Sequence, residues 1–391
     1  MTERLYYTSP YTSSWTTTIK DIIKCDHHYL ITLRETAFYP EGGGQPSDSG
    51  KINGIQIEDV FEENGEIYHK LSTIPESSTV NCELDWNRRF DHMQQHTGQH
   101  LLSAVLIDTY DIHTVSFHLG NDAVSIDLKI SSISEEQLTA VEHAVNTAIY
   151  ANKEIKTYHI QKEEIHTVPL RRIPEVEGHE VRIVEIDTID FSACCGTHVT
   201  RTGELGMIKL IKTEKQRGNT RLFFKSGMRA LADYQQSHNI LSAVSNKFST
   251  NRDLVLERLE KVEHEQKLLL KQLEQLQAEN AHYLCAELQS KKEGSLLVHE
   301  FKDRTLKDVQ PLIKQLLQTD ETVLILSSAL EQKVLFAHNS TSNIHCGELF
   351  KILLPSFNGK GGGGPKQAQA SFSSNQELQS FVISLKEKLS S

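Results

Sequence analysis

The stretch SACCGTHVT, residues 192–200, places two cysteines, a glycine, a threonine and a histidine within nine positions. Roughly a hundred residues earlier, QHTGQHLL (95–102) places His96 and His100 four positions apart. Imidazole and thiolate groups are the donors that Zn²⁺ prefers in proteins. The two stretches therefore raise the hypothesis that a loop and a distant segment meet around one metal ion.

The earlier pair lies within 91–108, where apolar periodicity predicts a helix that Asp91 can cap. Side chains four apart share one face of a helix, so both imidazoles would point the same way. Each stretch alone is a weak signal in a chain with 19 histidines, and two unrelated clusters or buried core histidines are the alternative. Together they predict a tetrahedral zinc site formed by His96, His100, Cys194 and His198.

One zinc chemistry is excluded by the helix sequence. A zincin protease needs H-E-x-x-H, in which the glutamate is the general base. Here Thr97 stands at the glutamate position of H-T-G-Q-H. Peptide hydrolysis of that type is therefore not expected.

Composition predicts a soluble chain in a reducing compartment. Hydrophobic residues make up 38% and charged residues 24%, and no apolar run is long enough to span a membrane. The polar N-terminus carries no apolar signal core, and six cysteines are scattered along 391 residues. We therefore expect a cytoplasmic protein without a membrane partner or a disulfide framework.

Charge is distributed unevenly along the chain. The net charge of −11 argues against binding nucleic acid through bulk electrostatics. The segment 201–230, which directly follows the cysteine-histidine loop, nevertheless carries eight Lys and Arg against two Glu. It could steer a polyanion toward the metal site, or it could be a solvated basic hairpin.

The order of predicted elements indicates an α+β protein in four segments. Short strand-like runs and turns predict a small β-barrel or sandwich, followed by a zinc-binding α/β segment, a long helical segment and a small Gly-rich α/β domain. The boundaries we expect are 1–88, 89–230, 231–293 and 294–391.

The helical segment carries a heptad seam with two polar interruptions. It could pack as a hairpin against 231–248 or as an intermolecular coiled coil, so a homodimer through the helical or C-terminal region is one expected arrangement. The seam residues are Val255, Leu259, Val262, Gln266, Leu269, Leu273, Leu276, Asn280 and Tyr283.

Four consecutive glycines, 361–364, lie within FNGKGGGGPKQAQASF (357–372). Bare backbone N–H groups suit the close approach of an anion such as phosphate. The alternative is a flexible surface loop.

Four motifs together resemble a known family. They are AFYPEGGGQPSDSG (37–50), HMQQHTGQHLLSA (92–104), ACCGTHVTRTGELG (193–206) and GKGGGGPKQAQA (359–370). In this order they resemble the alanyl-tRNA editing proteins called AlaX and the editing and C-terminal domains of alanyl-tRNA synthetase. The helical segment and the Gly-rich C-terminal domain are similar to the long form of AlaX, and nothing resembles an aminoacylation domain.

The resemblance implies hydrolysis in trans of tRNA(Ala) mischarged with serine and, to some degree, glycine. It also implies zinc held by an HxxxH pair and a CxxxH pair, which here are His96, His100, Cys194 and His198. The family usually has Cys-Gly-Gly-Thr-His, whereas Cys195 occupies the first glycine position in this chain. Spacing selects Cys194 as the ligand, although Cys195 could compete with it or oxidise with it.

Residues near the substrate follow from the same resemblance. Ser116 and His118, in TVSFHLG, stand where the family places substrate-facing polar residues, and Thr97 and Gln99 are secondary candidates. Ordinary strand and helix polar residues are the alternative. In the family the glycine loop borders the editing site, so Gly42, Gly43 and Gly44 are expected to shape it and Gln45, with Glu41, to lock it.

Basic side chains are candidates for tRNA contacts. Arg217, Arg221 and Lys225 could meet acceptor-stem phosphates, and Lys360 could touch tRNA further from the 3′ end.

Two other functions stay open at this point. One is a non-catalytic tRNA-binding or dimerising protein with structural zinc. The other is a DHH-type phosphoesterase, which is disfavoured because CDHHYL (25–30) lies in a predicted β-region without further acidic ligands. For the hydrolase, zinc could activate water or only orient the substrate, and the residues do not choose between these roles.

Overall fold

The computed structural model describes residues 1–174, 179–318, 321–341 and 344–390. It divides into two compact units, Met1–Ala243 and Val244–Ser391. Both units contain helices as well as sheets, so the predicted mixed α+β class is confirmed. The four predicted segment boundaries stay a prediction.

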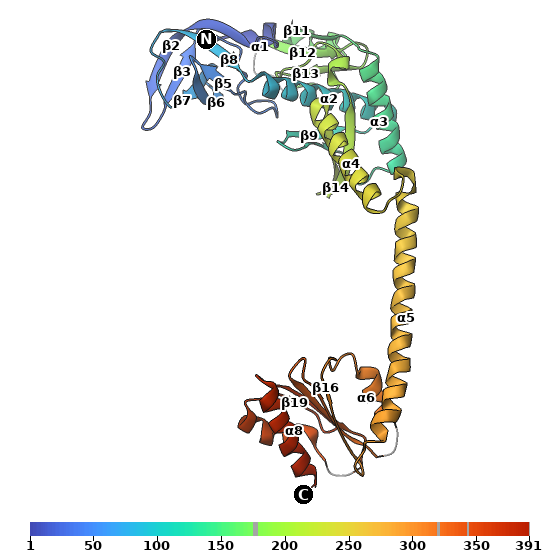
Figure 1. Cartoon of the computed structure of the whole chain (residues 1–391). Helices are drawn as coiled ribbons and strands as arrows, with labels where there is room; N and C mark the ends of the chain where they lie inside the picture. The colour runs from blue at the N-terminus through green and yellow to red at the C-terminus, as the bar shows by residue number, and fades with distance from the viewer. Residues whose placement is uncertain (175–178, 319–320, 342–343, 391) are drawn as a thin grey trace. The chain divides into compact units, whose positions relative to one another are not determined.

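A six-stranded closed barrel forms the N-terminal part of the first unit and is drawn in blue in Figure 1. Every second residue is buried along β7 and β8, while the residues between them are half-buried in β7 and exposed in β8, as a sheet with one core face requires. In spatial order the strands are β2 (Ser14–Lys24), β3 (Tyr29–Leu33), β7 (Glu66–Leu71), β6 (Ile55–Glu63), β5 (Gly50–Ile52) and β8 (Thr79–Leu84). Strand β1 (Glu3–Arg4) and the short helix α1 (Leu5–Thr8) precede the barrel strands in the sequence. Strand β4 (Glu35–Thr36) lies between β3 and β5 in the sequence and pairs in parallel with β1.

The long helix α2 (Trp86–Tyr110) carries the histidine pair. It begins five residues earlier than its apolar stripe suggested, because Asp85 and not Asp91 caps it by accepting the backbone N–H of Arg88 at 3.2 Å. Asp91 instead pairs with Arg229 at 2.6 Å. The helix ends where Asp111 adopts the left-handed conformation with φ 55°.

A buried ion pair joins α2 to the loops around the barrel. Arg89 and Asp48 are both inaccessible to solvent and form a salt bridge. The Arg89 guanidinium also donates to the carbonyls of Pro10, at 2.8 Å, and Ala37, at 2.5 Å. Its hydrogen bonds satisfy the buried charge, so α2 is fixed in register beside the glycine loop.

Two sheets surround α2 in the first unit. One has the order β14 (Ile208–Gln216), β15 (Asn219–Ser226), β10 (Val124–Leu128) and β9 (Thr114–Leu119). The other has the order β11 (Ile155–Gln161), β12 (Glu180–Ile186) and β13 (Asp190–Ala193). Helix α3 (Glu135–Tyr150) and strands β9, β13 and β15 contact α2. Because β13 ends at Ala193, the cysteine-histidine loop starts directly against this helix.

The second unit contains a five-stranded sheet with the order β16 (Leu296–Phe301), β17 (Val323–Ser328), β18 (Lys333–His338), β20 (Gln367–Ser371) and β19 (Lys360–Gly363). Only the β16–β17 pair is parallel among its described neighbours. Its helices are α6 (Gln310–Leu316), α7 (Cys346–Leu353) and α8 (Asn375–Ser390).

Glycines of the 361–364 run form an edge strand, which corrects the expectation of a loop. A Cβ at Gly361 or at Gly363 would stand 2.2 Å from a carbonyl oxygen of β20, Gln369 or Gln367 respectively. Glycine is therefore needed because β19 lies close against β20.

Helix α4 (Gly227–Lys247) runs across the division between the units, and α5 (Val255–Gln289) is the long gold-to-orange helix of Figure 1. Every residue of α5 from 263 to 280 is exposed, including the seam leucines Leu269, Leu273 and Leu276. Coiled-coil pairing of this seam stays a prediction. Among the described helices, none has the length and apolar character needed to cross a membrane.

Candidate metal centre

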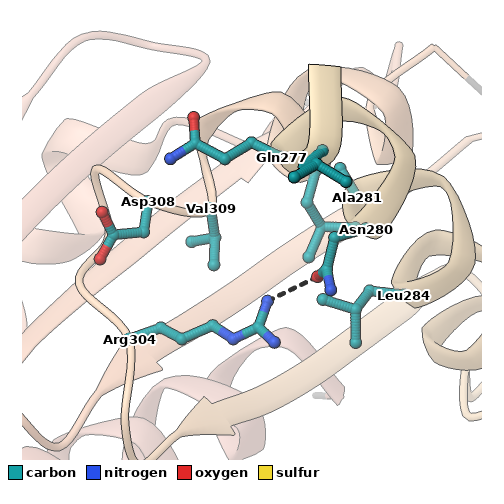
Figure 2. Close-up of a pocket in the computed structure, with 9 residues that line it drawn as sticks. Gln277, Asn280, Ala281, Leu284, Arg304, Asp308 and Val309 are labelled. Carbon is teal, nitrogen blue, oxygen red and sulfur yellow. Dashed lines mark hydrogen bonds between the residues drawn. The ribbon is translucent and has the colours of Figure 1, made fainter. Parts of the chain in front are cut away.

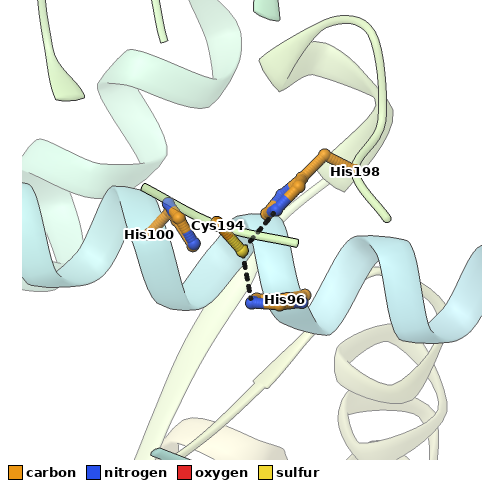
Figure 3. A group of neighbouring side chains, drawn as sticks. All are labelled: His96, His100, Cys194 and His198. Carbon is orange, nitrogen blue, oxygen red and sulfur yellow. Dashed lines mark hydrogen bonds between the residues drawn. The ribbon is translucent and has the colours of Figure 1, made fainter. Parts of the chain in front are cut away.

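The helix and the loop meet as the sequence predicts. One donor atom from each of four residues lies within 4.8 Å of all the others, and Figure 3 shows the four side chains turned toward a common centre; the residues are His96, His100, Cys194 and His198. The Cys194 Sγ lies 3.5 Å from His96 Nε2 and 3.4 Å from His198 Nε2. A zinc ion with tetrahedral angles and ordinary bond lengths would place sulfur and nitrogen about 3.6 Å apart. The spacing therefore fits a zinc-sized ion.

Each imidazole is held by its outer nitrogen. His96 Nδ1 contacts Gln45 Oε1, His100 Nδ1 contacts Asp190 Oδ2, and each distance is 3.0 Å. His198 Nδ1 contacts Thr97 Oγ1, also at 3.0 Å. Metal-binding histidines commonly use one nitrogen for the ion and the other for such a partner. The arrangement therefore leaves the Nε2 atoms to face the centre.

The charges in the cluster suit metal binding. Burial favours a neutral thiol, but the neighbouring His96, His198 and His100 outweigh it and hold the pKa of Cys194 well below its usual range. Burial also lowers the pKa of His198 to about 3. A thiolate beside a neutral imidazole is the protonation state that a metal ligand set requires.

Asp190 shifts the pKa of His100 upward, whereas the pKa of His198 is lowered. Burial opposes a charge on His100, but the hydrogen bonds to Asp190 and Cys194 outweigh burial and raise the pKa of His100. Burial alone would raise the pKa of Asp190, but the neighbouring His100 and Arg171 outweigh burial and lower the pKa below its usual value. The carboxylate therefore stays ionised behind the imidazole.

The loop between Cys194 and His198 is fixed by close packing. Gly196 donates its backbone N–H to Cys194 Sγ at 3.3 Å. A Cβ at Gly196 would stand 2.2 Å from His96 Cε1, so only glycine fits against that ring. Gln45 is fully buried and binds Thr197 twice, accepting its N–H at 3.1 Å and donating to its hydroxyl at 2.9 Å. The glutamine thus joins the glycine loop to the metal loop.

The glycine loop also reaches the cluster through Phe117. Gly43 and Gly44 have φ values of 58° and 80°, and Gly42 pairs with Gln45 to close the turn. A Cβ at Gly44 would approach the Phe117 ring to 2.8 Å. The predicted shaping role of Gly42, Gly43 and Gly44 is consistent with this packing and stays a prediction.

Phe117, rather than its two neighbours, packs on the cluster. Its ring stacks on His96 with centroids 5.2 Å apart. Successive side chains of a strand point to opposite faces, so Ser116 and His118 project from the other face of β9, where both are exposed. Ser116 donates to Asp127 Oδ2 at 2.6 Å. The role of Ser116 and His118 as substrate contacts stays a prediction.

The basic candidates are placed on two elements of the first unit and one of the second. Arg217 is in the turn between β14 and β15, Arg221 pairs with Asp127 at 2.7 Å, and Lys225 pairs with Asp233. Lys360 is exposed on β19. Their contacts with tRNA stay predictions.

Three residues that support the cluster were missed by sequence reasoning: Asp190, Phe117 and Arg182, whose guanidinium donates to the backbone carbonyls of Cys194 and Gly196. Asp190 precedes Cys194 by four positions in an ordinary strand sequence, and no motif marks it. Phe117 could have been found from the alternation of side chains along a strand, because it lies between Ser116 and His118 and must point to the opposite face.

A separate hollow of about 310 Å³ lies in the second unit (Figure 2). Arg304 donates across it to Asn280 Oδ1 at 2.8 Å. Its lining contains no histidine, cysteine or hydroxyl side chain among the described residues, namely Leu276, Gln277, Asn280, Ala281, Leu284, Arg304, Asp308, Val309 and Leu312. It therefore offers none of the donors found at the metal centre.

The fold and the site together define an α+β protein with a buried His/Cys cluster that could bind one metal ion. Residues 181–223 match the family described as the threonyl and alanyl tRNA synthetase second additional domain, and residues 293–391 match the DHHA1 domain. Alanyl-tRNA editing protein AlaX-L of Pyrococcus horikoshii is 33% identical over 93% of this chain and 93% of its own length. The chain belongs to the family of alanyl-tRNA editing proteins.

Two further relatives differ in length. Alanyl-tRNA editing protein Aarsd1 of Bos taurus is 35% identical over 62% of this chain and 56% of its own length. An alanine–tRNA ligase of Thermococcus kodakarensis is 29% identical over 99% of this chain but only 44% of its own length. This chain is thus similar to one part of that ligase.

Proposed function

We propose that the protein is an aminoacyl-tRNA hydrolase that releases serine, and also glycine, from mischarged tRNA(Ala) in trans. The observation that carries the proposal is the four-donor cluster within a chain similar to AlaX-L along nearly its whole length. The cofactor proposed is zinc, and the proposed location is the cytoplasm.

The donor set supports zinc because three imidazoles and one thiolate converge at tetrahedral spacing. A zinc ion held by His96, His100, Cys194 and His198 would act as a Lewis acid toward the aminoacyl ester or an attacking water. The protein itself supplies the positions: Gln45, Asp190 and Thr97 orient the three rings, and Arg182 and Gly196 shape the thiolate loop.

Selection of serine over alanine needs a group that recognises one hydroxyl. A site built to hydrogen-bond a substrate hydroxyl rejects a substrate that lacks it by roughly 10⁴-fold. Ser116 and His118 are proposed as contacts on the resemblance alone, because they project from the face of β9 opposite the one that packs on the cluster. The Thr97 hydroxyl is already engaged by His198 and by the N–H of Val199. Phe117 offers an apolar surface beside His96.

We place the acceptor stem against Arg217, Arg221 and Lys225 and a more distant part of the tRNA against Lys360. Each phosphate contact would make affinity fall with salt. Arg221 and Lys225 would have to share their charge with Asp127 and Asp233, so Arg217 and Lys360 are the freer candidates for a phosphate in this set.

The proposal is tested by deacylation of tRNA(Ala) carrying labelled serine, glycine or alanine. Serine and glycine should be released much faster than alanine, and His100→Ala should abolish the difference. His113→Ala is the matched control, because His113 is exposed beyond the end of α2 and pairs with Asp111. Equal release of serine and alanine by the zinc-loaded protein would contradict the proposal.

A second candidate function is a structural role for zinc, because the protein itself would supply all four ligands. Structural zinc sites have four protein ligands, whereas catalytic sites usually keep one position open. A tRNA-binding or dimerising protein with structural zinc would bind tRNA(Ala) but release no amino acid from it. Such a dimer could form through α5 or the C-terminal sheet, and sedimentation analysis would measure it.

A further inference from the structure

The three histidines of the cluster have outer partners of different chemistry: a carboxylate, an amide and a hydroxyl. We infer that these partners rank the donors, so that His100 is held most firmly and His198 is the donor that yields most readily. The inference rests on the metal-binding part of the proposed function and not on hydrolysis.

His100 has a partner that can only accept. Ser192 and Arg171 both direct donor groups at the Asp190 carboxylate, so it accepts the Nδ1–H of His100 at 3.0 Å. The proton of His100 is then on Nδ1, and the Nε2 lone pair is left for a metal. Ser192 donates to the same carboxylate oxygen at 2.9 Å, and Arg171 lies 3.6 Å from the other oxygen. Arg171 also donates to the backbone carbonyl of His100 at 3.0 Å. This network fixes both the ring and its backbone.

His96 is fixed in the same form by a neutral acceptor. The Gln45 amide accepts the backbone N–H of Thr197 at 3.1 Å, which identifies the contacting atom as its oxygen. That oxygen also faces His96 Nδ1 at 3.0 Å, so the His96 nitrogen must donate. The proton of His96 is therefore on Nδ1 before any metal arrives, but the partner carries no charge.

His198 is not fixed in this way. Thr97 Oγ1 accepts the N–H of Val199 at 3.3 Å, and its hydroxyl can rotate either to donate to His198 Nδ1 or to accept from it. Both tautomers of His198 are therefore satisfied, and one of them carries its proton on Nε2, where no metal can bind. His198 also stands on the loop after β13, whereas His96 and His100 share helix α2, and helices hold ligands more precisely than loops.

The difference between the three histidines matters because all four ligand positions of a tetrahedral zinc ion would be filled by the protein. Four protein donors leave no position for a substrate atom. His198 should leave the metal at the smallest cost in free energy, because Thr97 can hydrogen-bond to either tautomer of His198 when no metal is bound. Asp190, by contrast, is a positioning residue that keeps His100 in place.

The inference is tested by zinc affinity, measured by competition with a chromophoric chelator, and by the absorption spectrum of the cobalt-substituted protein. Asp190→Asn, which keeps the size of the side chain, should weaken zinc binding by about 10- to 100-fold. Thr97→Val should weaken it by a smaller factor. His198→Ala should retain measurable affinity and the sulfur-to-cobalt charge-transfer band, whereas His100→Ala should lose both.

Circular dichroism checks that each variant is folded, and His113→Ala should leave both readouts unchanged. If Asp190→Asn does not fold, Ser192→Ala removes one hydrogen bond from the same carboxylate and should act in the same direction. If His100→Ala and His198→Ala bind zinc equally well, or if His100→Ala binds it more tightly, the ranking of the donors is wrong, while the proposed metal site still stands. Failure of the unsubstituted protein to bind zinc would overturn the proposed metal site and the inference with it.

Discussion

Arg182 donates from Nη1 to the backbone carbonyl of Cys194 at 2.7 Å. The same nitrogen donates to the carbonyl of Gly196 at 3.0 Å, so one guanidinium holds both ends of the turn that follows the thiolate. Arg182 is only 6% exposed, and its guanidinium lies 4.9 Å from the centre of the Tyr7 ring. The cation–π contact helps to keep the buried charge in place.

Replacement of Arg182 by methionine should therefore loosen the loop from Cys194 to His198. Arg182→Met keeps a long side chain but leaves two carbonyls without their donor, which should reduce the free energy of unfolding by about 1–3 kcal/mol. Zinc affinity should fall as well, because the turn is no longer held. Urea unfolding and chelator competition measure the two effects. Arg201→Met is the control for zinc affinity, since the exposed Arg201 side chain donates to the carbonyl of Asn152 and not to the metal loop. Unchanged affinity in Arg182→Met would contradict the positioning role.

Gly196→Ala tests the contact between the loop and the helix. The new Cβ would stand 2.2 Å from His96 Cε1 and 3.1 Å from Gln45 Oε1, so the ring or the loop must shift. We expect a loss of about 1–3 kcal/mol in stability from overpacking and a clear loss of zinc affinity. Gly362→Ala has no atom within 4 Å of its added Cβ and should change neither quantity. A zinc affinity equal to that of the unsubstituted protein would show that His96 does not depend on this packing.

The convergence of the four donors was predictable because two short spacings encode it. The i,i+4 spacing places His96 and His100 on one helix face, and Cys194 and His198 bracket a glycine turn. The partners behind the rings were less accessible, since Asp190 and Arg182 reach the cluster only through the strand pairing of β12 and β13. Strand register is a long-range property that local patterns do not specify.

The fold shows a similar limit. Apolar periodicity located α2, but its true start depends on Asp85, which lies before the apolar stripe. The glycine run 361–364 has no side chains to show an alternating pattern, so sequence favoured a loop where the structure has the edge strand β19. Only the neighbouring strand β20 explains why glycine is needed there.

Stability should fall as pH is lowered, because His69 is buried in the barrel. Its Nδ1 contacts the carbonyl of Ile31 at 3.0 Å and its Nε2 contacts Thr36 Oγ1 at 2.9 Å. Burial lowers the pKa of His69 to about 4. An unfolded histidine has a pKa near 6.5, so between about pH 6.5 and pH 4 the unfolded chain binds a proton that the native chain does not. The free energy of unfolding should therefore fall by roughly 1 kcal/mol per pH unit in this window from His69 alone.

Urea unfolding at pH 7.5, 6.5, 5.5 and 4.5 measures this slope, with His69→Gln as the comparison. The variant should be less stable at pH 7.5 because the fit of the buried ring is lost, and its decline below pH 6.5 should be shallower. His92, whose pKa burial lowers to about 4, remains in both proteins and contributes equally to both slopes. Parallel declines for the two proteins would contradict the assignment to His69.

Alkylation should distinguish the two adjacent thiols. Cys195 is exposed, whereas Cys194 is half-buried with its sulfur facing the histidines. If Cys194 is the ligand, iodoacetamide should modify only Cys195 in the zinc-loaded protein, since a bound thiolate is withheld from reaction. After chelation Cys194 should also react, because its lowered pKa keeps it as the nucleophilic thiolate. Mass spectrometry of the digested protein locates each label. Cys195→Gly should then take up a label in this loop only after chelation, and protection of Cys195 by zinc would instead make Cys195 the ligand.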